Sequence, residues 1–226
     1  MGRAKEIRVA VIDSKTANAF VREHHYSGKV VNNSTLHFGA FLDGRLHGVL
    51  SYGPPMIKNK VIGLVEGTRW HEVLELNRMA FNEYLPKNSE SRCIAISLRL
   101  IKKNAPHIKW VLSFADGTQC GDGAIYRAAG FVLTAIKRNN SIIRLPDGRV
   151  SVNIVFTKSH HVLKNSGKAA IPEGSVALPG FQLRYVHLLW PGLRLTIPAI
   201  PFSEIEAQGA RMYKGKKLGP TGEGEA

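Results

Sequence analysis

An aspartate and a tyrosine occur close together in the stretch SFADGTQCGDGAIYRAAGF, residues 113–131. An apolar run ends at Asp116, and a glycine-punctuated turn then leads into a short predicted helix that carries Tyr126 and ends at Gly130. A carboxylate accepts a proton and a phenol can donate one. Both groups near one end of a buried strand therefore indicate a site that moves protons.

Each of these two residues also has a purely structural interpretation. An ionised carboxylate at the end of a buried strand needs partners or a function, but Asp116 can instead brace its loop through an Asx turn. The ring of Tyr126 can close the core while its hydroxyl stays in water. The residues alone leave both alternatives open.

A guanidinium inside a predicted strand is a third candidate. Arg78 lies between Leu76 and Phe81, where an unpaired positive charge is costly. It is expected either to form an ion pair with Glu75 or Glu90 or to bind phosphate.

His25 and Tyr26 follow the first predicted helix, where a histidine often does no more than interact favourably with the helix dipole. The two cysteines, Cys93 and Cys120, form no CxxC pair and are too few for a disulfide framework. A reducing, cytoplasmic setting is therefore expected.

Charge is the least ordinary property of the composition. The 226 residues include 31 Lys and Arg against 17 Asp and Glu, a net charge of +14. This balance suits a polyanion such as nucleic acid, although a generally basic surface gives the same number. No 18-residue apolar run is present, so no membrane association is expected. Nothing in the sequence indicates an oligomeric state.

The periodicity predicts alternating strands and helices. Asp43-Gly44 between two apolar runs predicts a β-hairpin, because both residues tolerate positive φ. The expected strands are 6–12, 36–42, 46–52, 71–81, 110–115, 131–136 and 150–156, with edge strands at 181–189 and 193–200, and the expected helices are 15–25, 90–103 and 122–129.

The predicted fold class is therefore α/β (α+β): a mixed central sheet flanked by helices, with extra C-terminal strands. Strands 73–80 and 110–115 should be parallel neighbours, and ligands gather at the carboxyl ends of such strands. We expect one domain over 1–214 with a C-terminal extension from about 158, then a loose tail over 215–226.

Six separated blocks share a pattern with a known family: HHYSG at 24–28, ELNRMAF at 75–81, LPKNSESR at 85–92, SFADG at 113–117, GAIYRAAGF at 123–131 and PAIPFSEIEAQGARMYKGKK at 198–217. Together they resemble the bacteriophage Mom family, GNAT-like enzymes that modify adenine in phage DNA. The resemblance implies a GNAT-like fold and conversion of adenine N6 to N6-carbamoylmethyl (acetamido) adenine, which protects DNA from restriction. It also implies double-stranded DNA with a flipped adenine as partner, and acetyl-CoA or a related acyl-CoA as donor.

The resemblance also implies roles for particular residues. Asp116 would orient or deprotonate the adenine amino group, and Tyr126 would protonate the leaving thiolate. Catalytic candidates by this resemblance are Asp116, Tyr126, Arg78 and Ser91, and cofactor-binding candidates are Asn88, Ser89, Arg92 and Ser113. One departure stands out: the turn at 87–92 has no glycine, whereas GNAT enzymes usually cradle the pyrophosphate there with bare backbone amides. Side chains are therefore expected to replace backbone donors, or the coenzyme pose to be altered.

The implied product joins nitrogen to a former methyl carbon, and an acyl-transfer site does little for a C–H bond. An additional device is then needed, for which iron held by His25 and Tyr26 is one option. Two other functions remain open: an ordinary acyl-CoA-dependent N-acetyltransferase acting on a protein or small amine, and a non-catalytic basic DNA-binding protein.

Overall fold

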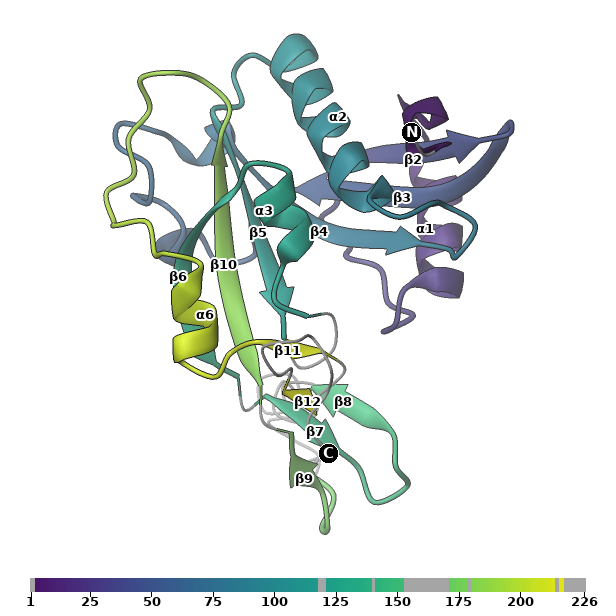
Figure 1. Cartoon of the computed structure of the whole chain (residues 1–226), viewed down its shortest axis with the longest axis vertical. Helices are drawn as coiled ribbons and strands as arrows, with labels where there is room; N and C mark the ends of the chain where they lie inside the picture. The colour runs from purple at the N-terminus through teal and green to yellow at the C-terminus, as the bar shows by residue number, and fades with distance from the viewer. Residues whose placement is uncertain are drawn as a thin grey trace, which may run out of the picture. The chain divides into compact units, whose positions relative to one another are not determined.

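The computed structural model describes residues 3–117, 121–139, 141–152, 171–178, 180–213 and 216–217 (Figure 1). The chain divides into two compact units. The first comprises Met1–Phe114, Gly123–Thr134 and Arg184–Ile200, and the second comprises Ala115–Asp122, Ala135–Leu183 and Pro201–Ala226. The prediction of a single domain over 1–214 stays a prediction.

The main sheet has seven strands in the order β1-β2-β3-β4-β5-β10-β6. Their bounds are β1 Arg8–Val11, β2 Leu36–Leu42, β3 Arg45–Gly53, β4 Val73–Phe81, β5 Trp110–Asp116, β6 Val132–Arg138 and β10 Phe181–Leu188. The strands from β1 to β4 pair antiparallel with their neighbours, and β4 pairs parallel with β5. The predicted mixed sheet is confirmed.

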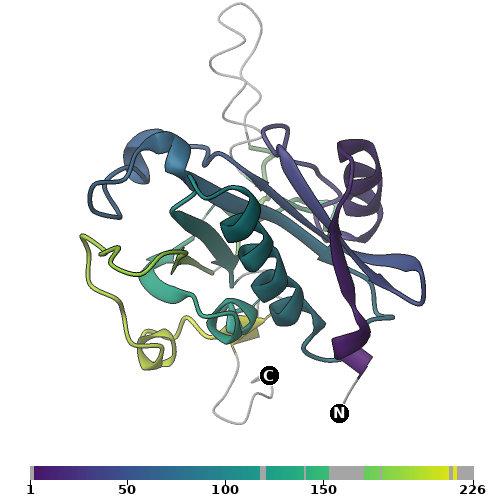
Figure 2. The same cartoon turned by 90° about the horizontal axis from the view of Figure 1, so that it is seen from above.

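Two helices cover opposite faces of the first four strands (Figure 2). α1, Ser14–His24, begins at Asp13, whose carboxylate accepts the Thr16 N–H at 2.8 Å, as a helix N-cap does. Its apolar side packs against Val49 of β3 and Ala80 of β4. On the other face, Tyr52 of β3 forms a hydrogen bond to Ser97 of α2, which spans Ser89–Asn104.

The remaining elements are short. In the first unit they are η1 Arg3–Glu6, η2 Lys58–Lys60, η3 Trp70–Glu72 and α3 Ala124–Ala128. In the second unit they are β7 Ile142–Arg144, β8 Val150–Val152, β9 Val176–Ala177, α6 Ser203–Ala207, β11 Met212–Tyr213 and β12 Lys216–Lys217. The β2–β3 hairpin turns at Asp43 and Gly44 with φ of 50° and 75°, as predicted.

The parallel strands β4 and β5 pair over a short length and then separate. Their register runs from Val73 opposite Trp110 to Leu76 opposite Ser113, and β4 continues to Phe81. A β-bulge in β4 lies beside this point and adds to the divergence. The register between β3 and β4 shifts there, so that Asn77 is an extra residue in β4. A site for a ligand is expected where neighbouring strands diverge in this way.

Two strand predictions for the C-terminal region are wrong. The 181–189 strand was expected at an edge, but β10 lies between β5 and β6, with Leu183, Tyr185 and Val186 buried. The 193–200 segment forms no regular strand and makes only isolated bridges, Val65 to Leu195 and Leu133 to Ile200. Its prolines remove donors that a continuous ladder requires.

Other expected bounds change little or cannot be compared. The 71–81 strand begins at Val73, because 70–72 form a 3-10 turn. The later part of the expected 150–156 strand, Cys120 and most of the expected tail lie outside the described residues. Within the described part of the chain, no helix has the length and apolarity needed to span a bilayer.

Candidate active site

Tyr126 is a buried residue of the short helix α3. Its ring packs against the rings of Phe131 and Tyr185, at centroid distances of 5.6 Å and 5.3 Å. The helix is preceded by Gly123 at φ 80°, and a Cβ there would lie 2.5 Å from Tyr185 Cε2. Only glycine meets both constraints, so this residue determines how closely α3 approaches β10.

A second phenol lies within electrostatic reach of Tyr126. Tyr52 is fully buried and its hydroxyl lies 2.6 Å from Ser97 Oγ, which in turn donates to the Ile94 carbonyl. Burial raises the pKa of Tyr52, and the nearby Tyr126 and Cys93 raise it further. Burial also raises the pKa of the Cys93 thiol to about 12, so both groups stay neutral at pH 7.

The turn before α2 adopts the backbone that a glycine would normally supply. Asn88 has φ 70° and ψ 12°, the left-handed conformation that asparagine tolerates better than most residues. The absence of glycine at 87–92 therefore does not prevent a tight turn. Ser89 is buried and its hydroxyl donates to the Pro86 carbonyl, while Ser91 Oγ lies 3.3 Å from the Asn88 carbonyl.

The other two cofactor-binding candidates, Arg92 and Ser113, form hydrogen bonds within the protein. Arg92 donates from Nη2 to the Lys5 carbonyl at 3.2 Å, and its Nε is buried without a hydrogen-bond partner among the described residues. Ser113 is buried and donates to the Leu76 carbonyl at 3.1 Å, at the last pair before β4 and β5 separate. Ser113 thus marks the point of divergence.

Arg78 lies on the face of the sheet that carries α1. Its Nε donates to the Lys29 carbonyl at 2.9 Å, and its Nη1 donates to the Asn77 carbonyl at 3.1 Å. The expected hydrogen-bonded ion pair with Glu75 or Glu90 is replaced by these two carbonyls. A carbonyl carries no net charge, so the guanidinium keeps a positive charge that can bind an anion.

The loop between α1 and β2 is fastened across the ends of β3 and β4. Asn33 Nδ2 donates to the Pro54 carbonyl at 2.6 Å, and Ser34 Oγ donates to Asn77 Oδ1 at 2.8 Å. A Cβ on Gly53 would lie 2.2 Å from the Asn33 carbonyl oxygen, so the loop needs glycine beneath it. These contacts hold the residues after α1 beside Arg78.

His25 is half-buried within the electrostatic reach of Arg78. Burial and that positive charge lower the pKa of His25 to about 4, so its imidazole is neutral at pH 7. The Ser27 N–H donates to Nδ1 at 3.1 Å, which places the ring proton on Nε2. Tyr26 is exposed, and its ring centroid lies 4.3 Å from that of His25.

Glu75 was expected from the sequence only as an ion-pair partner of Arg78, and the structure makes it a candidate site residue. Burial raises the pKa of Glu75 to about 7, against smaller opposing effects of a hydrogen bond from the Met56 N–H and of the Arg78 charge. A carboxyl with a pKa near neutrality can accept a proton at physiological pH. The sequence signal was an acidic residue between the apolar Leu74 and Leu76 of a predicted strand.

Asp116 is the last residue of β5 and is half-buried, which confirms that a carboxylate ends this strand. It belongs to the second unit, in which the neighbouring Gly117 N–H donates to the Phe181 carbonyl at 2.8 Å. The role of Asp116 beside Tyr126 stays a prediction.

The residues do not fit the iron site that was considered. No group of three or more His, Cys, Asp or Glu that could hold a metal ion gathers in the described ranges. The tautomer of His25 is also unsuitable, because Nδ1 accepts a hydrogen bond and Nε2 carries the proton. No chemical step is therefore assigned to iron at His25 and Tyr26.

The first unit therefore holds two groups of candidates. One combines Arg78, His25 and Glu75 on the α1 face, linked by the charge of Arg78. The other combines Tyr126 with Tyr52 and Cys93. This arrangement can bind an anion, accept a proton at Glu75 and donate one from a phenol.

Comparison with known proteins gives a family match over most of the chain. The model of the Mom protein family matches residues 6–204. A curated relative, "Methylcarbamoylase mom" of Escherichia phage Mu, is 40% identical over 129 residues, which are 57% of this chain and 53% of the relative. The chain thus matches about half the length of that relative.

Solved structures with a similar arrangement are acetyltransferases. A Bacillus subtilis acetyltransferase in complex with CoA has a TM-score of 0.45 and 12% identity, over 81% of this chain and 99% of its own. The ribosomal-protein-S18-alanine N-acetyltransferase of Escherichia coli has a TM-score of 0.45 and 10% identity, over 81% and 94%. At this level of similarity, no functional argument follows from these structures.

Proposed function

The chain belongs to the Mom protein family, and on this premise we propose that it is a transferase that modifies the N6 amino group of adenine in phage DNA. The proposed product is N6-carbamoylmethyl (acetamido) adenine, which protects the DNA from restriction. The family match over residues 6–204 is the observation that carries this proposal. The net charge of +14 supports a polyanionic substrate.

The adenine would be received beside Arg78 where β4 and β5 separate, because there it can meet a donor held on the α2 face. In duplex DNA its amino group is paired, so the base has to leave the stack, at a cost of a few kcal/mol. Arg78 would bind a phosphate beside the extruded nucleotide, since its two hydrogen-bond partners are carbonyls without a net charge. The neutral His25 lies close enough to be affected by that charge.

A proton must leave N6 as the new bond forms, because the amino lone pair is delocalised into the ring. Asp116 is proposed to orient or deprotonate the amino group. We add Glu75 to this role, since its raised pKa of about 7 lets it take up a proton near neutral pH.

The donor is proposed to be an acyl-CoA, held by the turn before α2. Asn88 gives this turn its left-handed bend, and the free Nε of Arg92 offers a buried donor nearby. Ser89, Ser91 and Ser113 would line the approach of the coenzyme. A bound acetyl-CoA would supply the two carbon atoms of the new group. An ammonia-level nitrogen would replace the thiolate at the carbonyl and become the amide, and Tyr126 would protonate that thiolate. The bond from N6 to the former methyl carbon would also require a two-electron oxidant, which takes up the two electrons of the broken C–H bond.

The experiment is expression in bacteria, followed by digestion of plasmid DNA to nucleosides and mass measurement of the adenosines. The wild-type chain should yield a modified adenosine and plasmid that resists restriction enzymes. Asp116→Asn and Tyr126→Phe should abolish the new mass. The matched control is Tyr84→Phe, which also removes a phenol hydroxyl, but from an exposed tyrosine whose hydroxyl donates to Asp43 of the β2–β3 hairpin.

Two results would contradict the proposal. A folded wild-type chain that acetylates amines and leaves adenine unchanged would identify an ordinary N-acetyltransferase. Salt-dependent DNA binding with no new adenosine mass would identify a DNA-binding protein without this activity.

A further inference from the structure

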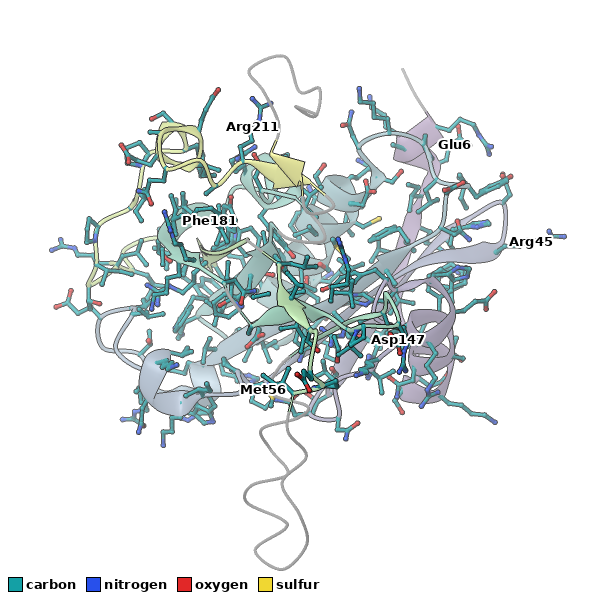
Figure 3. The ribbon with its side chains drawn as sticks, turned by 90° about the horizontal axis from the view of Figure 1, so that it is seen from below. Glu6, Arg45, Met56, Asp147, Phe181 and Arg211 are labelled. Atoms are coloured by element: carbon teal, nitrogen blue, oxygen red, sulfur yellow. The ribbon has the colours of Figure 1, made fainter. Side chains whose placement is uncertain are left out.

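The loop after β3 exposes apolar side chains among lysines. Three large apolar residues in it are exposed over 67%, 51% and 44% of their surface: Met56, Ile57 and Ile62. Lys58 and Lys60 lie between them and are exposed. We call these five residues the apolar-basic loop. Figure 3 labels Met56 in this loop and Arg45 at the other end of β3.

This loop is held in place on both sides. Before it, the Pro54 carbonyl accepts a hydrogen bond from Asn33. Within it, the Lys60 N–H donates to the Ile57 carbonyl and the Ile62 N–H to the Lys58 carbonyl. Val61, between Lys60 and Ile62, and Leu64, which follows the loop, are buried in a core cluster with Trp110. The apolar side chains are thus presented by an ordered turn.

Exposing these side chains in water is unfavourable, so a partner that covers them is expected. Proteins that unstack DNA insert apolar side chains such as Met and Ile between base steps, and neighbouring lysines bind the phosphates. We infer that the apolar-basic loop is a DNA-inserting element: Met56 and Ile57 occupy the gap left by the extruded adenine, and Lys58 and Lys60 bind flanking phosphates. This inference rests on the proposed function.

The position of the loop favours DNA over other partners. Gly53, three residues before Met56, pairs with Glu75 across β3 and β4, and the Met56 amide lies close enough to Glu75 to lower the pKa of its carboxyl. Glu75 lies within electrostatic reach of Arg78, which is proposed to bind the phosphate of the same nucleotide. Apolar side chains beside the residues that receive the base would face the space that the extruded base leaves in the duplex.

The test uses the full chain and a duplex from a plasmid segment that the chain modifies. The target adenine is placed either in a normal pair or opposite an abasic site, where no pair has to be broken. Met56→Ala combined with Ile57→Ala should weaken binding to the paired duplex by at least about tenfold. Affinity for the abasic duplex should change by less than about threefold, because extrusion is easier there.

The lysines should give a different signature. Lys58→Ala combined with Lys60→Ala should weaken binding to both duplexes alike and reduce the salt slope by about 0.9 for each phosphate that the variant no longer neutralises. With 2-aminopurine at the target position, the wild-type chain should raise its fluorescence, and the Met56/Ile57 variant should raise it less.

Matched controls are Val11→Ala, an apolar residue exposed over 65% of its surface on β1, and Arg45→Ala at the hairpin. Neither should change binding or fluorescence. Equal losses on both duplexes with the Met56/Ile57 variant would overturn the inference, as would wild-type behaviour. Loss of binding to anionic vesicles or of self-association, with DNA extrusion unchanged, would instead assign the loop to a membrane or a second copy.

Failure of this inference is distinguishable from failure of the proposed function. If the wild-type chain modifies no adenine in cells, the proposed function is wrong and no target segment exists. If modification occurs while the Met56/Ile57 variant extrudes and binds DNA as the wild type does, only the inserting loop is wrong.

Discussion

At the scale of single residues, one cation acts on two titratable neighbours. The positive charge of Arg78 lowers the pKa of His25 and also opposes the rise that burial imposes on Glu75. Both effects favour the unprotonated form, a neutral imidazole and a carboxylate. A proton acceptor next to a bound anion is what removal of a proton from an amino group requires.

Arg78 and Ser91 should be needed for modification and not for folding. Arg78→Ala and Ser91→Ala are expected to abolish the new adenosine while the protein stays soluble, since Arg78 donates only to loop and strand carbonyls. The measurement is nucleoside mass together with thermal unfolding. Arg22→Ala, which removes an exposed arginine of α1, is the control. Unfolding of both variants would return these residues to structural roles.

Glu75 should give a pH-dependent stability difference. Its folded pKa of about 7 lies above its ordinary value of 4.5, so the folded state binds the proton more tightly than the unfolded state. As the pH rises through 7, the folded protein loses this proton, and the stability that the protonated carboxyl contributes is lost with it. Glu75→Gln should raise the melting temperature relative to wild type more at pH 8 than at pH 5. Exposed Glu66→Gln should show no such trend, and equal shifts at both pH values would contradict the assignment.

At the scale of elements, local signals predicted the fold better than long-range ones. The hairpin at Asp43-Gly44 depends on neighbouring residues alone and was predicted correctly. The insertion of β10 between β5 and β6 depends on pairing between distant segments, and it was missed.

Parts of the candidate site could not be predicted from the sequence for the same reason. The sequence identified Arg78 and Tyr126, and the structure places each in a distinct cluster. The extra residue Asn77 depends on the register between β3 and β4, which no local pattern gives. The raised pKa of Glu75 depends on burial by the folded chain, and the left-handed Asn88 has no glycine to signal it.

The approach of α3 to β10 should depend on the missing side chain of Gly123. Gly123→Ala should cost about 1–2 kcal/mol for the left-handed backbone and about 1–3 kcal/mol more for the clash with Tyr185. Gly148 has a similar φ of 84° and open space around its Cβ, so Gly148→Ala should show only the first cost. Denaturant unfolding measures both. Equal losses of unfolding free energy in the two variants would show that Tyr185 moves away from the added methyl group at little cost.

At the scale of the whole molecule, the net charge favours a polyanionic partner. A net charge of +14 draws a polyanion at long range but selects no sequence. In the proposed function, selection of adenine would have to come from the site, and the two candidate groups of the first unit supply an anion-binding group, a proton acceptor and a phenol.

Binding of the chain to DNA should therefore weaken steeply with salt. The logarithm of the binding constant should fall linearly with the logarithm of salt concentration, with a slope of about −0.9 for each phosphate contacted. Fluorescence anisotropy of a labelled duplex measures this slope. A binding constant independent of salt would contradict a role for the basic surface.

The mass and fragmentation of adenosine from plasmid DNA test the central claim most directly. When the chain is expressed, we predict a modified adenosine whose added mass equals one carbamoylmethyl group replacing one hydrogen, located on the base at N6. Unmodified adenosine from cells that contain the folded chain, or an added acetyl group in its place, would contradict the account.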